Sequence, residues 1–224
     1  MEQKTVLITG ASSGIGASAA VLLRDKGYTV YGAARRVEKM NDLKERGIIP
    51  LALDVTEEDS LVRCVNTIIE QEGGLDVLVN NAGYGSYGAI EDVPIEEAYR
   101  QFEVNLFGLA RLTQLVLPHM RRNGYGRLVN ISSMAGKVYT PFGAWYHASK
   151  HALEGWSDCL RLEVTPFGID VVVIEPGGIK TPWGEIAADN LKKTSGSGAY
   201  AEEANKTAES TVTLYASDHL TEPE

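Results

Sequence analysis

The stretch Thr5-Val6-Leu7-Ile8-Thr9-Gly10-Ala11-Ser12-Ser13-Gly14-Ile15-Gly16 decides the fold. It opens with a short apolar run typical of a buried strand, and apolar residues at helical spacing follow from Ala17 to Leu23. The three glycines between these segments permit a tight turn and a close approach of the backbone to a ligand. A helix that begins at such a turn presents free N–H groups, which suit a pyrophosphate. The stretch therefore predicts a strand, a phosphate-binding loop and a helix.

The rest of the chain repeats this alternation of short apolar runs and amphipathic stretches. Strands are predicted near residues 4–9, 28–34, 48–54, 75–80, 126–132 and 168–175. Runs such as Val171-Val172-Val173-Ile174 are apolar on both faces, as expected for a parallel sheet that helices cover on both sides. Right-handed crossovers between the strands give an α/β fold: a Rossmann-type, doubly wound parallel sheet in three layers, ordered 3-2-1-4-5-6.

Length and charge limit the classes of protein to consider. A chain of 224 residues fills one core and is too short for two ordinary domains, so residues 1–224 are expected to form a single domain. The net charge is −9, which argues against nucleic acid or an anionic membrane as the main partner. The N-terminus resembles no signal peptide, and no apolar run approaches the roughly 20 residues that span a bilayer. A cytoplasmic location is expected.

The cysteines and histidines predict neither a disulfide framework nor a metal site. Cys64 and Cys159 are far apart, and each lies within a helical pattern. His147 and His151 are four residues apart, like a metal-binding pair, but no third ligand accompanies them.

The residues that suggest chemistry are Ser133, Tyr146 and Lys150. Tyr146 and Lys150 lie four apart in a helical pattern, so their side chains share one face. A tyrosine with a pKa of about 10 exchanges protons poorly at neutral pH, and a nearby ammonium group lowers that pKa. Ser133, at the end of the preceding strand, is placed to hydrogen-bond a substrate oxygen. The three suit proton transfer to or from a carbonyl or alcohol oxygen.

The end of the second strand predicts which dinucleotide binds. Dinucleotide-binding folds place an acidic residue there for ribose hydroxyls, or an arginine for a 2′-phosphate. Here the strand ends in Arg35-Arg36 with no acid, and a guanidinium grips a phosphate through paired hydrogen bonds. NADP(H) is therefore expected rather than NAD(H). The alternative is that both arginines merely face solvent.

Taken together, these motifs resemble those of the short-chain dehydrogenase/reductase family. The resemblance spans residues 4 to about 183 and rests on Thr9–Gly16, Asn80-Asn81-Ala82-Gly83, Asn105, Ser133, Tyr146, Lys150 and Pro176-Gly177-Gly178. It implies hydride transfer between nicotinamide and an alcohol or carbonyl substrate, with Asn105, Ser133, Tyr146 and Lys150 as catalytic residues. Asn105 would hold a water beside the lysine in a proton relay. Ser13 departs from the second basic residue that some NADP-using members carry.

The resemblance also implies the cofactor-binding residues. These are Gly10, Ser12, Ser13, Gly14, Ile15 and Gly16 in the first loop, Arg35, Arg36, Asp54, Val55, Asn81, Ala82 and Gly83 after the next strands, and Tyr146, Lys150, Pro176, Gly177, Ile179 and Thr181. Asp54 and Val55 would lie at the adenine edge. The alternative for Asp54 is a place in the N-cap region before Glu57. Asn81-Ala82-Gly83 would form a ribose-facing turn that stabilises the sheet, and Ile179 and Thr181 would contact the carboxamide.

Residues 184–220 match the place where the family carries a mobile substrate lid, with 192–198 as a flexible stretch. The family continues into another helix and a seventh strand. Thr221-Glu222-Pro223-Glu224 fits a helix start, and these later elements are expected to be missing from this sequence. Related proteins are dimers or tetramers, so a homodimer or homotetramer is expected.

The branch most similar to this chain is that of the 17β-hydroxysteroid and retinol dehydrogenases. Aromatic residues expected near the pocket mouth favour an apolar or aromatic carbonyl: Tyr84, Tyr87, Tyr139, Phe142, Trp145 and Trp183. One alternative function is an NADP(H)-sensing regulator without turnover. Such a regulator is expected to have lost Ser133, Tyr146 or Lys150, and this chain retains all three. Another is an epimerase or dehydratase of the extended branch, against which the glycine spacing and the short C-terminal part argue.

Overall fold

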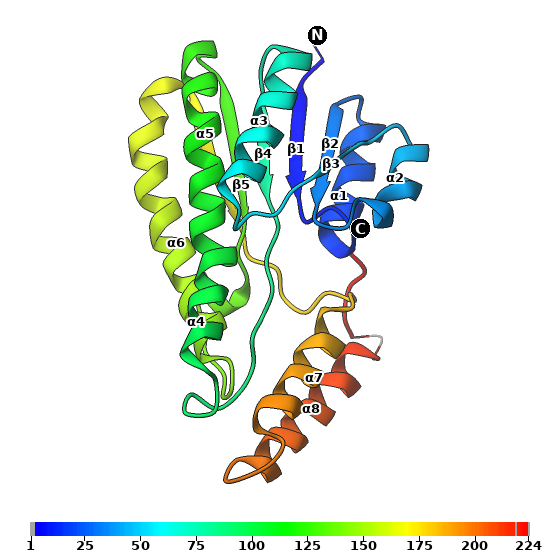
Figure 1. Cartoon of the computed structure of the whole chain (residues 1–224), viewed down its shortest axis with the longest axis vertical. Coiled ribbons are helices and arrows are strands. Elements are labelled where there is room, and N and C mark those ends of the chain that lie inside the picture. The colour runs from blue at the N-terminus through cyan, green and yellow to red at the C-terminus, as the bar shows by residue number, and fades with distance from the viewer. Residues whose placement is uncertain (1–2, 218, 224) are drawn as a thin grey trace.

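The computed structural model, which describes residues 3–217 and 219–223, contains one sheet of six parallel strands (Figure 1). The strands lie in the order β3-β2-β1-β4-β5-β6, so the predicted fold class and strand order are confirmed. Their bounds are β1 Thr5–Thr9, β2 Thr29–Ala34, β3 Ile49–Ala52, β4 Val77–Asn80, β5 Gly126–Ile131 and β6 Ile169–Ile174.

Helices cover both faces of the sheet, as the apolar strands require. The central strand β1 is wholly buried: Leu7 packs into one core beneath α3 and α5, while Val6 and Ile8 pack into another beneath α1. The helices are α1 Gly14–Asp25, α2 Asn41–Glu45, α3 Glu58–Glu72, α4 Ile95–Phe102, α5 Gly108–Asn123, α6 Ala144–Val164, α7 Trp183–Ser195 and α8 Ala201–Tyr215. Short 3₁₀ turns span Val37–Met40, Met134–Gly136 and Thr165–Phe167, and a π-turn spans Glu103–Phe107.

The carboxyl ends of the strands point toward the hairpin of α7 and α8 (Figure 1). Open α/β sheets bind their ligands at this end. The loops that follow β1, β2, β4, β5 and β6 carry most of the residues singled out in the sequence. The topology therefore gathers segments that are far apart in the chain at one edge.

Residues 184–220 are largely helical. Ala188 and Leu191 of α7 pack on Ala204 and Ala208 of α8, and Tyr87 and Phe142 cover this small core. The expectation of a flexible stretch at 192–198 is wrong for its first half, because α7 continues to Ser195 before the turn begins. Two amphipathic helices that bury alanines against each other can approach closely, which explains a regular hairpin in this polar segment.

The segment after α8 returns to the loop that follows β6. Thr221 pairs with Ile179 in a parallel bridge, and the Lys180 N–H donates to the Thr221 carbonyl at 2.9 Å. No helix begins within the described residues from Thr221 to Pro223, and Glu224 of the expected helix start lies outside them. Among the described residues, no helix has the length and apolar character needed to cross a bilayer.

Candidate active site

The glycine-rich loop between β1 and α1 is shaped by contacts that only glycine allows. Gly10 and Gly14 have φ angles of +68° and +55°, in the left-handed region that favours glycine. A Cβ on Gly16 would stand 2.5 Å from Asn81 Nδ2 and 2.6 Å from the Gly10 carbonyl oxygen. Ser13 precedes α1 without capping it through its side chain. The start of α1 thus leaves N–H groups for an anion such as a pyrophosphate.

The Asn81-Ala82-Gly83 turn is fastened to this loop. Asn81 Nδ2 donates to the Thr9 carbonyl at 2.9 Å and to the Gly10 carbonyl at 3.3 Å. The Thr9 hydroxyl in turn accepts the N–H groups of Asn81 at 3.0 Å and Ala82 at 2.9 Å. These bonds give the turn a role in holding β1 and β4 together.

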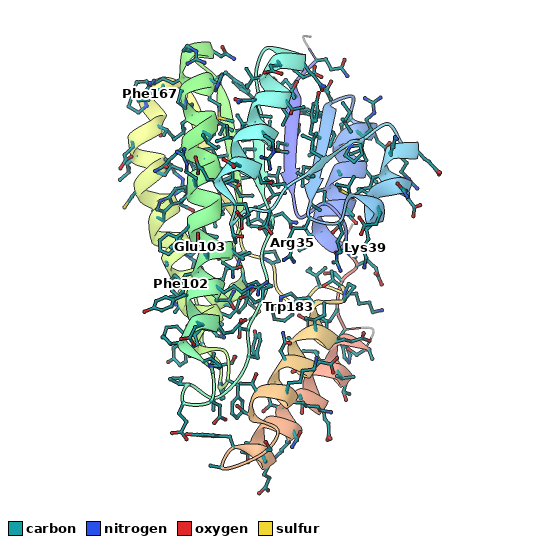
Figure 2. The ribbon with its side chains drawn as sticks, in the orientation of Figure 1. Arg35, Lys39, Phe102, Glu103, Phe167 and Trp183 are labelled. Atoms are coloured by element: carbon teal, nitrogen blue, oxygen red, sulfur yellow. The ribbon has the colours of Figure 1, made fainter. Side chains whose placement is uncertain are left out.

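Basic side chains follow β2 beside the same loop. The Ala11 N–H donates to the Ala33 carbonyl at 3.2 Å, which brings the glycine-rich loop against the end of β2. Arg35 and Arg36 come next and are exposed, as is Lys39. Figure 2 shows Arg35 and Lys39 near the carboxyl end of the sheet. Lys39, which lies in the 3₁₀ turn Val37–Met40, was not predicted to belong to this site.

Asp54 takes part in the turn before α3. Its Oδ1 accepts the Thr56 N–H at 3.1 Å and the Thr56 hydroxyl at 2.8 Å, while its own N–H donates to Ser60 Oγ at 3.0 Å. This pattern supports the alternative of a local turn and leaves contact with adenine a prediction. Val55 lies where α5 comes close, because its carbonyl faces the position that a Cβ of Gly108 would occupy.

Tyr146 and Lys150 lie on one face of α6, both buried, at 8% and 6% exposure. Lys150 Nζ stands 6.0 Å from the centre of the Tyr146 ring and donates to the Ile131 carbonyl at 2.8 Å. Ser133, which follows β5, accepts the Ala135 N–H at 3.1 Å and is hydrogen-bonded to Tyr146. The three residues expected to act together are therefore within reach of one another.

The pKa values of this pair differ from the expectation. Burial raises the pKa of Tyr146, and the hydrogen bond from Ser133 opposes that rise without cancelling it. Burial also lowers the pKa of Lys150 to about 8, against the attraction of Glu154. The prediction that Lys150 lowers the pKa of Tyr146 is therefore wrong for this structure, because burial dominates the shift and only Ser133 opposes it. At neutral pH Tyr146 is a phenol and Lys150 is mostly an ammonium.

Asn105 lies in the π-turn between α4 and α5. Its Oδ1 accepts the Tyr84 N–H at 3.1 Å, and its Nδ2 donates to the Tyr84 carbonyl at 3.0 Å and to Ser149 Oγ at 3.1 Å. The Gly108 N–H bonds the Glu103 carbonyl, which widens the helix at this point. Nothing in the sequence pattern indicated Ser149, which links Asn105 to the Tyr146 carbonyl at 2.8 Å. The relay through a water stays a prediction.

The loop after β6 joins the strand ends on the far side. The Met134 N–H donates to the Pro176 carbonyl at 3.0 Å, which ties this loop to the one that carries Ser133. Thr181 faces the glycine-rich loop, since its Cγ2 lies 3.2 Å from the point where a Cβ of Gly14 would stand. The expected cofactor residues in the loops after β1 and β6 thus face each other. Gly177 and Ile179 lie between Pro176 and Thr181 in the second of these loops.

Aromatic rings surround Tyr146. Its ring centre lies 5.9 Å from Tyr87 and 5.5 Å from Trp183, and Trp183 lies 6.0 Å from Tyr215 of α8. Tyr87 and Trp183 were expected at the pocket mouth, whereas Tyr215 was not singled out. Tyr139 is 87% exposed. The rings form an apolar wall over the phenol.

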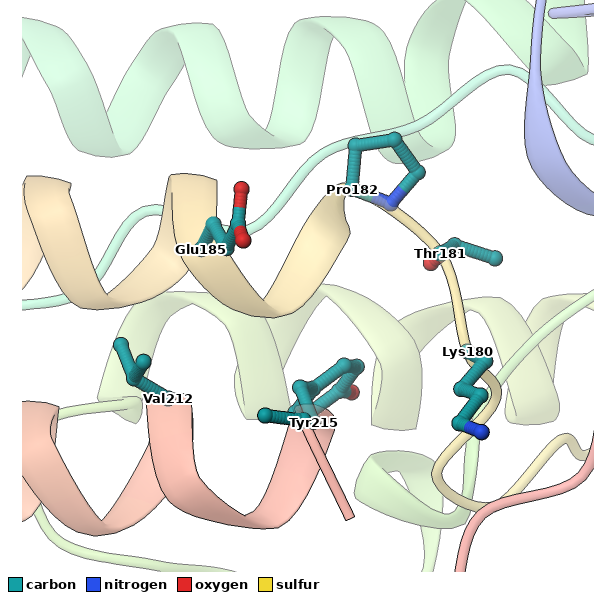
Figure 3. Close-up of a pocket in the computed structure, with 7 residues that line it drawn as sticks. Lys180, Thr181, Pro182, Glu185, Val212 and Tyr215 are labelled. Atoms are coloured by element: carbon teal, nitrogen blue, oxygen red, sulfur yellow. The ribbon is translucent and has the colours of Figure 1, made fainter. Parts of the chain in front are cut away.

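A cavity of about 340 Å³ lies between the loop after β6 and the helical hairpin (Figure 3). Its lining comes from the loop, α7 and the end of α8: Lys180, Thr181, Pro182, Glu185, Val212, Tyr215 and Ala216. The volume suits a small molecule. Because Tyr215 contacts Trp183, which in turn contacts Tyr146, the cavity adjoins the aromatic wall.

The histidines do not form a metal pair. His147 Nδ1 lies 2.7 Å from the Val138 carbonyl, and His151 Nδ1 lies 2.9 Å from the His147 carbonyl. Within the described part of the chain, no group of three or more histidine, cysteine or acidic side chains is arranged to hold a metal.

Comparison with known proteins agrees with this geometry. A family model described as short chain dehydrogenase matches residues 4–191. VdlC of Helicobacter pylori, a probable short-chain type dehydrogenase/reductase, is 42% identical over 199 residues, 89% of this chain and 73% of that protein. A 3-ketodihydrosphingosine reductase of Bacteroides thetaiotaomicron is 42% identical over 181 residues, 81% of this chain and 66% of that protein.

Solved structures of similar proteins contain both nicotinamide dinucleotides. A variant of actinorhodin polyketide ketoreductase with NADPH has a TM-score of 0.80 at 32% identity, covering 96% of this chain and 91% of that one. NAD⁺-bound xylitol dehydrogenase has a TM-score of 0.84 at 27% identity, covering 98% and 87%. With most of its length matched by the family model and its strand ends arranged as described, the chain belongs to the short-chain dehydrogenase/reductase family of oxidoreductases.

Proposed function

We propose that the protein is an NADP(H)-dependent oxidoreductase that interconverts a carbonyl compound and its alcohol, a secondary alcohol first of all. The observation that carries this proposal is the triad of half-buried Ser133 with buried Tyr146 and Lys150, beside a loop that fits a dinucleotide. The loop fits because it packs so closely at Gly16 that a Cβ there would clash with its neighbours. In addition, α1 begins at this loop without a side-chain cap, so its first N–H groups are available to a phosphate. Bound NADPH would supply the hydride to the carbonyl carbon.

Tyr146 would give the proton to the carbonyl oxygen in reduction and take it back in oxidation. Its raised pKa keeps it a phenol at neutral pH, which suits the donor role. Ser133 would orient the substrate oxygen toward the phenol. Lys150, an ammonium held at the Ile131 carbonyl, would offset the negative charge that develops on Tyr146 and would bind the nicotinamide ribose. Asn105 would support the proton relay by holding a water beside Lys150.

The preference for NADP(H) over NAD(H) rests on the basic residues after β2. Arg35 and Arg36 are exposed at the strand end, and Lys39 follows in the 3₁₀ turn Val37–Met40. Three cationic side chains at this point favour a coenzyme that carries a 2′-phosphate on its adenosine ribose. Ser12, Ser13 and Ile15 of the glycine-rich loop would contact the pyrophosphate.

The coenzyme preference is tested by measuring the affinity of NADPH and NADH for the wild type and Arg35→Ala. The loss of one charge-assisted contact, about 1.5–3 kcal/mol, weakens NADPH binding roughly 10- to 100-fold and changes NADH binding little. Arg46→Ala, which removes another exposed arginine at the end of α2, serves as the control and leaves both affinities unchanged. Equal weakening of NADPH and NADH in Arg35→Ala would contradict the assignment.

The substrate proposed is a carbonyl compound with an apolar or aromatic substituent. The rings of Tyr87, Trp183 and Tyr215 enclose Tyr146 on the side of the helical hairpin, so a substrate at the phenol would rest against an apolar wall. The name of the Bacteroides relative describes reduction of a ketone on a lipid chain, which agrees with this chemistry. Similarity to the branch of 17β-hydroxysteroid and retinol dehydrogenases stays part of the proposal.

A panel of ketones, aldehydes and quinones with NADPH tests the activity directly. We expect aryl alkyl and long-chain ketones to be reduced faster than small polar ones such as hydroxyacetone. Binding of NADPH without turnover of any compound would favour a sensing role instead. The cytoplasmic location and the homodimer or homotetramer also stay predictions, the latter tested by light scattering of the purified protein.

A further inference from the structure

A buried carboxylate, Glu154, lies behind Lys150. It follows Lys150 by four residues on α6, so the two side chains share a helix face. The Glu154 side chain is only 10% exposed, and its Oε2 pairs with Lys137 Nζ at 3.0 Å. Lys137 is half exposed and also reaches Glu175 at 3.5 Å. A line of charges therefore leads from the surface to the back of the active site.

The second oxygen of Glu154 has no such partner. Within the described part of the chain, Glu154 Oε1 and Ser132 Oγ are both buried and form no hydrogen bond. Both lie 3.0 Å from the point where a Cβ of Gly136 would stand, so they face the same small space beneath the loop that carries Ser133. Burying an unpaired carboxylate oxygen is costly unless a nearby charge compensates it.

Lys150 is the charge that can compensate it. Lys150 is buried, and the single described hydrogen bond of its ammonium group goes to the Ile131 carbonyl. Of the titratable groups around it, Tyr146 has its ring centre 6.0 Å from Lys150 Nζ and is protonated at neutral pH. Glu154 and Glu175 both pair with Lys137. Burial alone drives the lysine toward its neutral form, and the attraction of Glu154 opposes this.

We propose that Glu154 is the internal counter-ion of Lys150, a positioning residue that keeps the active-site lysine charged. Ser132 and Gly136 complete its setting: Gly136 lets the loop pack on the carboxylate, since a Cβ there would stand 2.9 Å from Glu154 Cγ. Lys137 pairs with Glu154 Oε2 and leaves Glu154 Oε1 buried without a hydrogen-bond partner among the described residues. The catalytic consequence of this arrangement rests on the proposed function, but the state of the lysine does not.

The direct test is the titration of Lys150 itself, followed in the full chain through the NMR signal of its ¹³C-labelled ε-carbon and assigned with Lys150→Met. In Glu154→Gln, which keeps the shape and removes the charge, the midpoint falls by about one pH unit or more. Glu154→Asp retains a charge and keeps the midpoint above that of the glutamine variant. An unchanged midpoint in Glu154→Gln would overturn the proposal.

Lys137→Gln is the matched control, because it removes the surface anchor and leaves the carboxylate. If Glu154 only anchors the loop, Lys137→Gln and Glu154→Gln should shift the Lys150 titration midpoint in the same way. If Glu154 is the counter-ion, the Lys150 midpoint in Lys137→Gln should stay unchanged or rise. A fall in Lys137→Gln would contradict the proposal even if Glu154→Gln does not fold.

Activity separates this proposal from the function proposed above. If the protein reduces ketones, the alkaline decline of kcat/KM moves to lower pH in Glu154→Gln, and not in Lys137→Gln. If the midpoint of Lys150 falls as expected but no substrate is turned over, the counter-ion role stands and the proposed function fails.

Discussion

At the scale of single residues, Asn105 shows how one side chain can hold the framework of a site. It uses both its oxygen and its nitrogen on the backbone of Tyr84, and it also reaches Ser149 next to Lys150. It is almost fully buried, at 1% exposure. Its amide therefore satisfies polar groups that water reaches poorly, and it fixes the segment after β4 against α6.

Replacing Asn105 with alanine tests this structural part of its role. The Tyr84 N–H, its carbonyl and the Ser149 hydroxyl all lose a partner, so the free energy of unfolding should drop by about 1–3 kcal/mol. Urea denaturation followed by circular dichroism measures it. Asn66→Ala, at an exposed position of α3, should leave the unfolding free energy within about 0.5 kcal/mol. Equal effects of the two changes would refute the role assigned to Asn105.

At the scale of elements, the hairpin of α7 and α8 closes over the aromatic wall. Its docking is specific: the Ala89 N–H donates to Ser195 Oγ at 2.9 Å, and a Cβ on Gly88 would stand 2.5 Å from Thr194. Gly184 faces the ring of Tyr215 so closely that a methyl group there has no room. The hairpin is the part of the molecule expected to act as the substrate lid.

Gly184→Ala should therefore displace the Tyr215 ring and loosen the hairpin. We expect a several-fold rise in KM for the ketone substrate and faster tryptic cleavage at Lys192 and Lys193, with an overpacking cost of about 1–3 kcal/mol. Gly155→Ala is the control, because Gly155 is exposed on α6 with nothing within 4 Å of its Cβ position. It should stabilise the protein by about 0.5–1 kcal/mol. Unchanged cleavage in Gly184→Ala would show that the ring contact does not hold the hairpin.

The strands were predictable because each combines an apolar run with a turn, and their order follows from right-handed crossovers. Tyr146, Lys150 and Ser133 were predictable because helical spacing and a strand end place them together. The π-turn at Asn105 and the partnership with Ser149 were not, since a one-residue widening of a helix leaves no periodic signal. Tyr215 was missed because its neighbours in the site come from segments more than 30 residues away.

At the scale of the whole molecule, a thiol in the core beneath α3 makes the free energy of unfolding fall as the pH becomes alkaline. Cys64 is buried there, and burial raises the pKa of its thiol from 9.0 to about 12. The unfolded chain loses this proton first, so the contribution of the thiol is fully present below pH 9.0 and is lost as the pH rises toward 12. Buried tyrosines such as Tyr87, whose pKa is raised in the same way, add to the loss above pH 10.

Cys64→Ala isolates this contribution. The unfolding free energy of the wild type should fall more steeply between pH 9 and 12 than that of the variant, by up to about 1.4 kcal/mol per pH unit. Below pH 9 the variant is less stable because of its cavity. Cys159→Ala, which changes an exposed thiol, should follow the wild-type slope under reducing conditions. Identical slopes for Cys64→Ala and the wild type would contradict the assignment.

The central claim is that the strand ends bring a nicotinamide and the phenol of Tyr146 to one carbonyl group. The most direct measurement uses NADPH that carries deuterium at both C4 positions of the nicotinamide, with an aryl alkyl ketone, and analyses the alcohol by mass spectrometry. We expect deuterium on the carbinol carbon with the wild type, and a rate at least about 100-fold lower with Tyr146→Phe, which retains NADPH binding. An alcohol without deuterium, or an equal rate with Tyr146→Phe, would contradict the account.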